Sequence, residues 1–497
     1  MSETTYYRPA GAWVGDVIPV GRDDAFWLYY LHERRETPSA GMPWHLVVTD
    51  DLVRYEDRGL AVPSGGPDAP DLNVYTGSVV TDDDGTHHLF YTGQNPDRCG
   101  ADGRPLQLVM HAVSTDDMRT WTKLPEDTFG AGPGYETGDW RDPFVLRDDA
   151  AGLWRMIVTA RHDAGPQRRR GVLAQLTSHD LRHWEPVGPL WDPGRHVAHE
   201  CPDVFRWGDW WYLVYSEFSD AFATRYRMAR SLAGPWVAPE RDTIDGRSFY
   251  AAKSAERDGR RVFFGWIATR EGGHDDGPWE WAGTLATLEA RRHDDGTLGF
   301  AIPAEVLDSF AEPLPVTLGD AGEAAVGRPD GYDAVLADGD VPDRYRVRLD
   351  VEIPADATGR AACAETGLLL HASDDGDEAW ALRLEPRRGR LVLDRWPRRR
   401  TGGEQWQISG DVPHAVELER PCDLRAGRHR LDVVVDGEIL QATLDGDVSL
   451  STRVHRRAGD RIGVFAADGV VRADLAVTTR GDRPAPEPVP AAVAATS

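Results

Sequence analysis

Cysteine is scarce in this 497-residue sequence, which contains only Cys99, Cys201, Cys363 and Cys422. These four are scattered and lack the paired spacing of metal sites or of disulfide frameworks. No apolar run approaches the ~18 residues that a membrane-spanning helix requires. The first residues, M-S-E-T-T-Y-Y-R-P-A, also lack the basic and then apolar pattern of a secretory signal. We therefore expect a cytoplasmic protein without a disulfide framework, although a secreted chain already trimmed of its signal would look similar apart from the initiator Met.

Basic residues are few compared with acidic ones: 56 Lys and Arg against 82 Asp and Glu, a formal net charge of −26. Such a negative field repels phosphate backbones and anionic membrane surfaces, so we expect no nucleic-acid partner and no membrane partner. Two basic clusters, at 168–170 and 398–400, lie beside Gly or Pro. We interpret both clusters as solvated loops.

Helical periodicity is almost absent before residue 300, and a repeat takes its place. The segments T-D-D-L-V-R-Y (49–55), S-T-D-D-M-R-T-W (114–121), T-S-H-D-L-R-H-W (177–184) and the degraded A-R-S-L-A-G-P-W (229–236) each end in an aromatic residue after a polar turn. Interleaved with them are five units of an apolar strand, a Gly/Asp-rich turn and an aromatic strand, one of which is C-P-D-V-F-R-W-G-D-W-W-Y-L-V-Y. Five such units predict a five-bladed β-propeller, with an irregular all-β sandwich as the alternative.

Carboxylates open the first strand of several units. Asp16, Asp142 and Glu200 hold this position in units one, three and four, and Ser78 holds it in unit two. Because equivalent positions of a propeller lie on one ring around its axis, we expect these side chains to meet at one end of the channel. Acids that share a pocket repel one another, so at least one pKa should be raised, as an acid/base pair requires. The adjoining Arg141 suggests a positioning role for Asp142.

Several motifs resemble glycoside hydrolase family 32, which includes invertases, levanases and inulinases. W-R-D-P-F (140–144) resembles the family's Arg-Asp-Pro motif, and E-C-P-D (200–203) resembles its Glu-Cys motif. Further likenesses lie at 44–55, at Y-T-G-S (75–78), at F-Y-A-A-K (249–253) and at G-W-I (265–267). The resemblance extends over about residues 10–305 and more weakly beyond.

The resemblance implies a retaining, exo-acting β-fructofuranosidase. We expect no metal and no cofactor, because a pair of carboxylates already supplies the nucleophile and the proton. Carried over by motif, it implies Asp16 as the nucleophile, Glu200 as the acid/base and Asp142 as the residue that grips fructosyl hydroxyls. Arg141 and Ser78 join the expected substrate site. Candidate walls of the pocket are Trp44, Trp140, Tyr250 and Trp266.

The sequence departs from the family at the nucleophile. Most members carry Asn-Asp-Pro-Asn-Gly there, whereas this chain has G-D-V-I-P (15–19), so the Asn that would touch the sugar is missing. Sucrose as the natural substrate and the usual pocket shape are thereby called into question. Three alternatives stay open: a fructosyltransferase using the same site, an inverting arabinofuranosidase-type propeller, and a non-catalytic sugar-binding protein.

The C-terminal region contains short two-faced strands from about residue 343, which predict a β-sandwich. We expect a catalytic propeller over 1–305, an irregular linker over 306–342, the sandwich over 343–480 and a disordered tail over 481–497. The linker and the tail are predicted from their Pro, Gly and Ala content.

Overall fold

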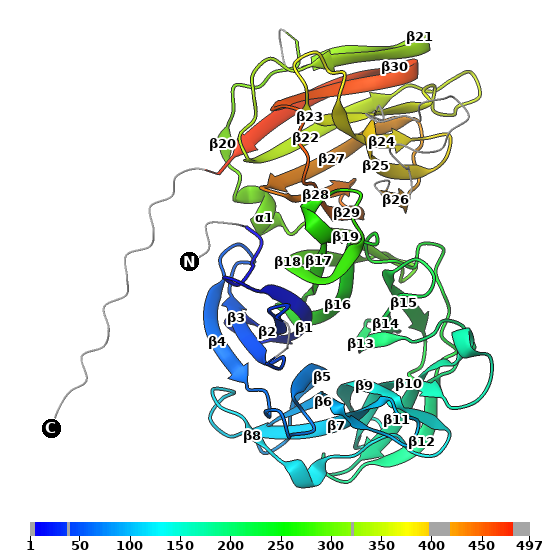
Figure 1. The fold of residues 1–497 in the computed structure, drawn as a ribbon. Helices are drawn as coiled ribbons and strands as arrows, with labels where there is room; N and C mark the ends of the chain where they lie inside the picture. The colour runs from blue at the N-terminus through cyan, green and yellow to red at the C-terminus, as the bar shows by residue number, and fades with distance from the viewer. Residues whose placement is uncertain (1–4, 37–39, 320–322, 397–417, 481–497) are drawn as a thin grey trace, which may run out of the picture.

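The computed structural model describes residues 5–36, 40–319, 323–396 and 418–480. These residues are almost entirely strands, arranged as a β-propeller followed by a β-sandwich, as predicted (Figure 1). No helix in these ranges has the length and apolarity needed to cross a bilayer. The predicted tail, 481–497, lies outside the described residues.

The propeller has five blades of antiparallel strands, and in each blade the first strand pairs with the second, the second with the third and so on. Blade 1 contains β1 (Trp13–Gly21), β2 (Phe26–Glu33), β3 (Trp44–Thr49) and β4 (Glu56–Val62); blade 2 contains β5 (Asn73–Thr81), β6 (His87–Cys99), β7 (Pro105–Ser114) and β8 (Thr122–Lys123); blade 3 contains β9 (Tyr135–Asp148), β10 (Leu153–His162), β11 (Gly171–Ser178) and β12 (Glu185–Trp191); blade 4 contains β13 (Glu200–Trp207), β14 (Trp210–Glu217) and β15 (Ala223–Ala229); blade 5 contains β16 (Phe249–Arg257), β17 (Arg260–Arg270), β18 (Trp279–Arg292) and β19 (Leu298–Ala301). In blade 4 two isolated bridges along β15 take the place of a fourth strand. Short 3-10 turns lie at Pro125–Asp127, Gln167–Arg169 and Glu271–Gly273.

Both sequence repeats fall where a propeller requires them. The five strand–turn–strand units are the first and second strands of the five blades. The polar segments lie at the turn after the third strand, where Leu52, Met118 and Leu181 all adopt a positive φ. A left-handed backbone conformation costs conformational energy at a leucine or a methionine. Its recurrence in three blades therefore indicates that the same turn geometry is used in each.

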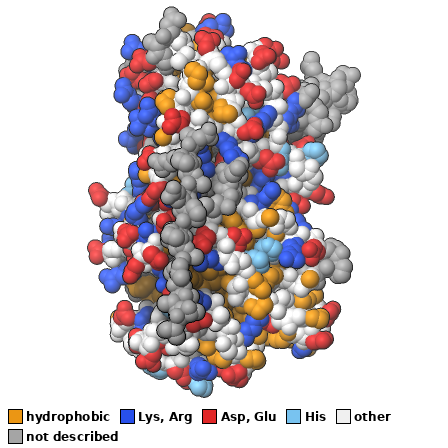
Figure 2. All heavy atoms as spheres, turned by 90° about the vertical axis from the view of Figure 1, so that its left-hand side faces the viewer, with side chains coloured by type: hydrophobic (Ala, Val, Ile, Leu, Met, Phe, Trp, Pro, Cys, Tyr) orange, Lys and Arg blue, Asp and Glu red, His pale blue; other side chains and the backbone are white. Residues whose placement is uncertain are grey.

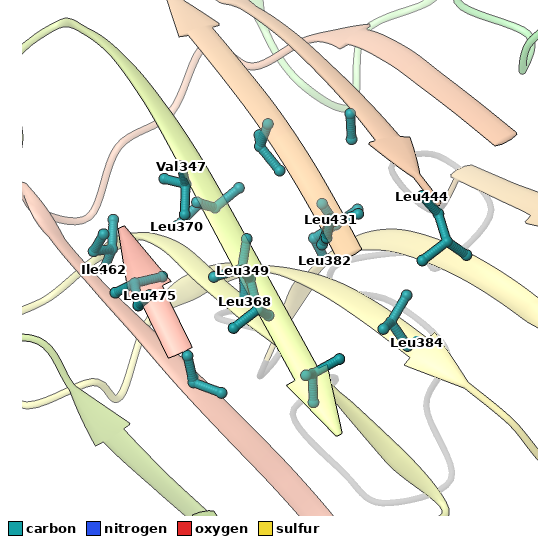
Figure 3. Packing of buried hydrophobic residues seen from close by; sticks show 14 of the residues in the cluster. Val347, Leu349, Leu368, Leu370, Leu382, Leu384, Leu431, Leu444, Ile462 and Leu475 are labelled. Carbon is teal, nitrogen blue, oxygen red and sulfur yellow. The ribbon is translucent and has the colours of Figure 1, made fainter. Parts of the chain in front are cut away.

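The C-terminal sheet closes into a sandwich because one long strand serves two sheets. Its elements are β20 (Glu312–Pro313), β21 (Glu323–Leu336), β22 (Arg344–Ile353), β23 (Glu365–Ala372), β24 (Ala379–Glu385), β25 (Arg390–Trp396), β26 (Leu418–Pro421), β27 (Gly427–Asp436), β28 (Ile439–Leu444), β29 (Val448–Arg453) and β30 (Arg461–Thr479), with α1 (Ala304–Asp308) before them. The first half of β30 pairs with β23 and its second half with β22. Strands that switch sheets in this way form the corners of sandwiches. Leucine and valine side chains from both layers fill the space between them (Figure 3).

The predicted linker contains a strand that the sequence pattern did not indicate. Residues 323–336, expected to be irregular, form β21, which pairs with β30 over nearly its whole length. Pro329 and Gly331 fall in a break of the pairing between Arg328 and Tyr332, so they do not interrupt the ladder where it needs N–H donors. Ala and Gly in this segment lowered its apparent strand propensity, and a partner more than a hundred residues away supplies the pairing.

Candidate active site

A bulge interrupts the inner strand of every blade, near the beginning of β1, β5, β13 and β16 and midway along β9. The pairing with the second strand shifts after Val14 in β1, after Tyr75 in β5, after Arg141 in β9, after Glu200 in β13 and after Tyr250 in β16. A bulge turns side chains away from the regular alternation of a strand. The five bulges therefore form one irregular ring at the same end of the propeller.

The predicted acids lie in this ring, but not at one equivalent position. Glu200 is the last paired residue before its bulge, Asp142 is the first bulged residue, and Asp16 is the second. Ser78 lies one position further along its strand than Asp16 does. The predicted one-to-one equivalence of these four residues is thus wrong by up to three positions, because the extra bulge residues are invisible in a sequence repeat.

Cys201 links the acids to one another. Its backbone N–H donates to Asp142 Oδ2 at 2.9 Å, and its thiol lies 3.6 Å from Asp16 Oδ2. Asp142 and Cys201 both adopt a positive φ, 56° and 51°, at the same bulge position of neighbouring blades. Each of the three carboxylates also raises the pKa of another, Glu200 that of Asp16, Asp16 that of Asp142 and Asp142 that of Glu200, so they share one site.

Asp16 is partly buried and accepts two side-chain hydrogen bonds. Thr76 Oγ1 donates to Oδ2 at 2.6 Å, and Trp266 Nε1 donates to Oδ1 at 3.0 Å. Burial raises the pKa of the Asp16 carboxyl, the bonds from Thr76 and Trp266 pull that pKa down, and the charge of Glu200 raises it. These bonds also fix the orientation of the carboxylate.

Glu200 is held from two sides. Arg141 Nη2 donates to Oε1 at 3.1 Å, and the Tyr250 hydroxyl donates to Oε2 at 2.8 Å. Burial raises the pKa of Glu200, Arg141 opposes that rise, and Asp142 adds to it. The side chain retains 22% of its accessible surface, so a ligand can reach it.

Asp142 is buried, and both its backbone and its carboxylate contact neighbouring side chains. Its backbone N–H donates to Thr92 Oγ1 at 2.8 Å, and the Arg141 Nε atom lies 3.8 Å from its Oδ2. Burial and the charge of Asp16 raise the pKa of Asp142 above its usual value, and Arg141 and Lys253 oppose that rise. Two cationic neighbours favour the ionised carboxylate in this position.

Three of the predicted site residues serve packing in the contacts that the structure describes. Trp44 is fully buried and donates its indole N–H to the Val74 carbonyl at 2.9 Å. Ser78 is bonded on both sides to the β9 backbone, donating to Pro143 O and accepting from Val145 N–H, each at 2.9 Å. Trp140 is 2% exposed and packs in the core of blade 3. Tyr250 and Trp266, in contrast, contact the carboxylates directly.

Sequence reasoning missed Lys253, which is 2% exposed on β16. Its ammonium donates to the Gly77 carbonyl of blade 2 at 2.6 Å. Burial lowers the pKa of Lys253, and Cys201, Asp203, Asp142 and Asp16 counter that effect. The signal was present in F-Y-A-A-K, because a lysine that directly follows an apolar run on an inner strand needs a partner.

The missing asparagine beside Asp16 has a steric explanation. A Cβ added to Gly15 would lie 2.5 Å from Trp281 Cη2 and 2.9 Å from Leu31 Cβ. Trp281 is 37% exposed and packs edge-on against Trp266. Gly15 thus leaves room for an exposed indole where a larger side chain would collide.

The sequence predicts neither metal nor cofactor. Among the described residues, His196, Glu217 and Asp220 could come together around an ion. However, both Glu217 oxygens already accept hydrogen bonds, from three backbone N–H groups and from Arg225. We therefore assign no metal to this group.

The sequence is similar to those of known proteins. The family model of the Glycosyl hydrolases family 32 N-terminal domain matches residues 7–297. The raffinose invertase of Escherichia coli is 28% identical over 93% of this chain and 92% of its own length. The sucrose-6-phosphate hydrolase of E. coli is 27% identical over 59% of this chain, and the match covers 62% of that relative, less than two thirds.

Solved structures share the fold. The exo-inulinase of Aspergillus awamori superimposes with a TM-score of 0.73 at 17% identity, covering 96% of this chain and 98% of that one. The sucrose-6-phosphate hydrolase of Lactobacillus gasseri gives 0.72 at 17% identity, covering 96% and 93%. At such identities the likeness speaks for the fold, a propeller followed by a sandwich. Because the family model covers more than half of the sequence, the chain belongs to glycosyl hydrolase family 32.

Proposed function

We propose that this glycoside hydrolase releases terminal β-fructofuranosyl units by a retaining mechanism in which Asp16 is the nucleophile and Glu200 the acid/base. The observation that carries the proposal is the meeting of Asp16, Asp142 and Glu200 around Cys201. Retaining glycosidases need two carboxyl groups about 5–5.5 Å apart, one to attack and one to transfer protons.

In the first step, an Asp16 oxygen attacks the anomeric carbon while Glu200 protonates the departing glycosidic oxygen. Thr76 and Trp266 hold the Asp16 carboxylate in one orientation, which lowers the cost of reaching the transition state. Burial favours the protonated form of Glu200, so its proton is available to the leaving group. The products are a covalent fructosyl–Asp16 ester and a free alcohol.

In the second step, Glu200, now ionised, takes a proton from water, and the water oxygen attacks the same carbon. The Asp16 ester breaks and the carboxylate is regenerated, so the configuration is retained overall. Arg141 and Tyr250 stabilise the charge on Glu200 between the two steps. Asp142, whose ionised form Arg141 and Lys253 favour, is proposed to accept hydrogen bonds from the fructosyl hydroxyls.

We assign residues 1–305 as the catalytic domain, with Trp266 and Tyr250 as parts of the pocket wall.

The names of the relatives suggest which fructosides to try, since they include a raffinose invertase and levanases. Sucrose, raffinose and levan therefore form the first substrate panel.

The test compares wild type with Asp16→Asn and Glu200→Gln on this panel and on arabinofuranosides. Each substitution should lower kcat by about 10⁴-fold or more, since removing one member of a catalytic unit costs nearly as much as removing the whole unit. NMR of the first product should show the β-anomer. The matched control is Asp209→Asn, a turn carboxylate whose side chain is 87% exposed. Equal sugar release by wild type and both variants would end the proposal.

A further inference from the structure

A short loop joins β14 to β15 close to Glu200, and it contains two phenylalanines in the run F-S-D-A-F (218–222). Phe218 retains 43% of its accessible surface. Phe222 is half-buried, and its ring stacks on that of Tyr250 with the centroids 4.2 Å apart and the planes at 15°. Because the Tyr250 hydroxyl donates to Glu200, Phe222 is one ring away from the proposed acid/base. We call residues 218–222 the acid-side loop.

A single buried carboxylate holds the backbone of the acid-side loop. Glu217 is 0% exposed and accepts from three successive backbone N–H groups, those of residues 219–221, at 3.1, 2.8 and 3.0 Å. Arg225 Nε donates to the same carboxylate at 3.2 Å and balances its charge. Hydrogen bonds to an ionised, buried acceptor are strong, and three of them in a row leave the loop little freedom. The conformation of the loop therefore depends on Glu217.

The backbone of Phe222 is strained. Its φ of 56° lies in the left-handed region, which costs conformational energy at a bulky aromatic residue. Such strain persists where the surrounding structure requires the residue, and it gathers at functional sites. Burial compensates only in part, because Phe222 packs at the edge of the apolar cluster around Cys201 and Trp266 and keeps some of its surface exposed. A partly exposed ring held in this way beside Glu200 is positioned for a ligand.

The order of the rings indicates which part of a substrate meets Phe222. Trp266, which donates to Asp16, contacts Tyr250 with 5.5 Å between the ring centroids, and Phe222 stacks on the same Tyr250 ring. The three rings thus form a row that begins at Asp16 and ends at the acid-side loop. In a retaining mechanism the attacking carboxylate and the departing group lie on opposite faces of the sugar carbon. The leaving group therefore departs toward Glu200 and the loop end of this row.

We propose that Phe222 is a specificity-determining residue that packs against the leaving group, and that Glu217 is the positioning residue that holds it there. This inference rests on the proposed function and adds the kind of leaving group that the site favours, one that presents an apolar face. Ligand pockets combine apolar and aromatic walls with a few polar groups that orient the ligand. Here Glu200 and Arg141 supply the polar groups, and Phe222 supplies the apolar surface on the leaving-group side.

The experiment compares kcat/KM for three β-fructofuranosides whose leaving groups are methanol, benzyl alcohol and glucose. Methanol and benzyl alcohol are similarly weak acids, so these two substrates differ mainly in the ring that can pack against Phe222. Wild type should prefer at least one of the two ring-containing substrates over the methyl fructoside by about tenfold or more, the range of an apolar contact in a pocket. In Phe222→Ala this ratio should fall by a similar factor, and the benzyl and glucosyl arms distinguish an aromatic from a sugar face.

Two further variants separate this role from a structural one. Phe222→Tyr keeps the ring and should keep the wild-type ratio. Glu217→Gln should lower the ratio as Phe222→Ala does, because an amide presents N–H groups where the loop needs an acceptor. A purely structural role of Glu217 would instead lower Tm and reduce kcat/KM for all three substrates equally.

The control is Leu60→Ala, an apolar side chain 58% exposed on β4 of blade 1, which should leave the ratio unchanged. A ratio identical in wild type and Phe222→Ala would overturn this inference while leaving the proposed function intact, and so would a wild type without preference for either ring-containing substrate. An unchanged ratio in Glu217→Gln would overturn the role given to Glu217. Cleavage of none of the three substrates would instead count against the proposed function.

Discussion

Glu200 and Asp16 are both partly buried carboxyl groups, and their hydrogen-bond partners differ. The Asp16 bonds come from a hydroxyl and an indole, whereas Glu200 contacts a guanidinium and a phenol. Activity should require ionised Asp16 and protonated Glu200. It should therefore be lost as pH falls through the pKa of Asp16 and again as pH rises through that of Glu200.

Tyr250→Phe should move the alkaline limb of the kcat/KM profile to higher pH. The phenol donates to Glu200 Oε2 and favours the carboxylate, so its removal raises the pKa of Glu200 and keeps the acid protonated further into the alkaline range. Since only one hydroxyl is removed, a purely structural defect would lower the rate without moving the limb. The control is Tyr332→Phe on β21 of the sandwich. An unchanged limb, or one displaced to lower pH, would contradict the role given to Tyr250.

At the scale of elements, the bulges determine which side chains enter the site. Each bulge adds residues to an inner strand, so the side chain at the first bulge position points in another direction than those of its paired neighbours. Asp142, Cys201 and Ala251 hold this position in blades 3, 4 and 5. The blade 2 bulge contains Thr76, and Gly77 directly follows it. Thr76 contacts Asp16, and the Gly77 carbonyl accepts the bond from Lys253.

Gly77→Ala should weaken both stability and catalysis. A Cβ at this position would lie 1.8 Å from the Phe90 carbonyl oxygen, so β5 must move away from β6 and carry Thr76 with it. The expected loss is about 1–3 kcal/mol of unfolding free energy, measured by urea denaturation, together with a lower kcat. Gly132→Ala is the matched control, because a Cβ there meets nothing within 4 Å. If Gly77→Ala matched this control in both measurements, the bulge would not be as tightly constrained as proposed.

For the whole molecule, polar and apolar contacts join the propeller to the sandwich. Asp245, after blade 4, accepts from the Ser451 backbone N–H at 3.0 Å and from its hydroxyl at 2.7 Å, both on β29. Val434 and Ile439 of the sandwich belong to the same apolar cluster as propeller residues. In the ribbon, β28 and β29 lie against blade 5 (Figure 1). Acidic and basic side chains are interspersed over the outer face seen in Figure 2, as on an ordinary solvated surface.

Asp245→Ala should destabilise the two parts together. Burial raises the pKa of Asp245 and the nearby Arg420 opposes that rise, so the substitution removes the strongest negative charge acting on a buried guanidinium. The expected cost is about 3–5 kcal/mol, seen in calorimetry as one transition at a lower Tm. Asp149→Ala, whose side chain is 94% exposed, is the control and should leave Tm unchanged. Two separate transitions, with only one displaced, would show that the parts unfold independently.

Local pattern predicted most of the architecture. Alternating side chains, Gly/Asp turns and aromatic strands are properties of neighbouring residues, so the five blades and the sandwich could be inferred from them. The Asp-Pro and Glu-Cys motifs likewise made Asp142 and Glu200 candidates for the site. Prediction failed for β21, because its strand character depends on pairing with β30, far away in the chain.

The sequence by itself determined the all-β fold and which acids are candidates for chemistry, since both follow from short-range periodicity and from residue type. The tertiary structure alone decided the bulge register, the reach of Lys253 across to blade 2 and the stacking of Phe222 on Tyr250. These features depend on which distant strands lie side by side. The free energy of a hydrogen bond or an ion pair depends on how close its two groups lie in space. The number of residues that separate them in the chain does not reveal this spatial distance.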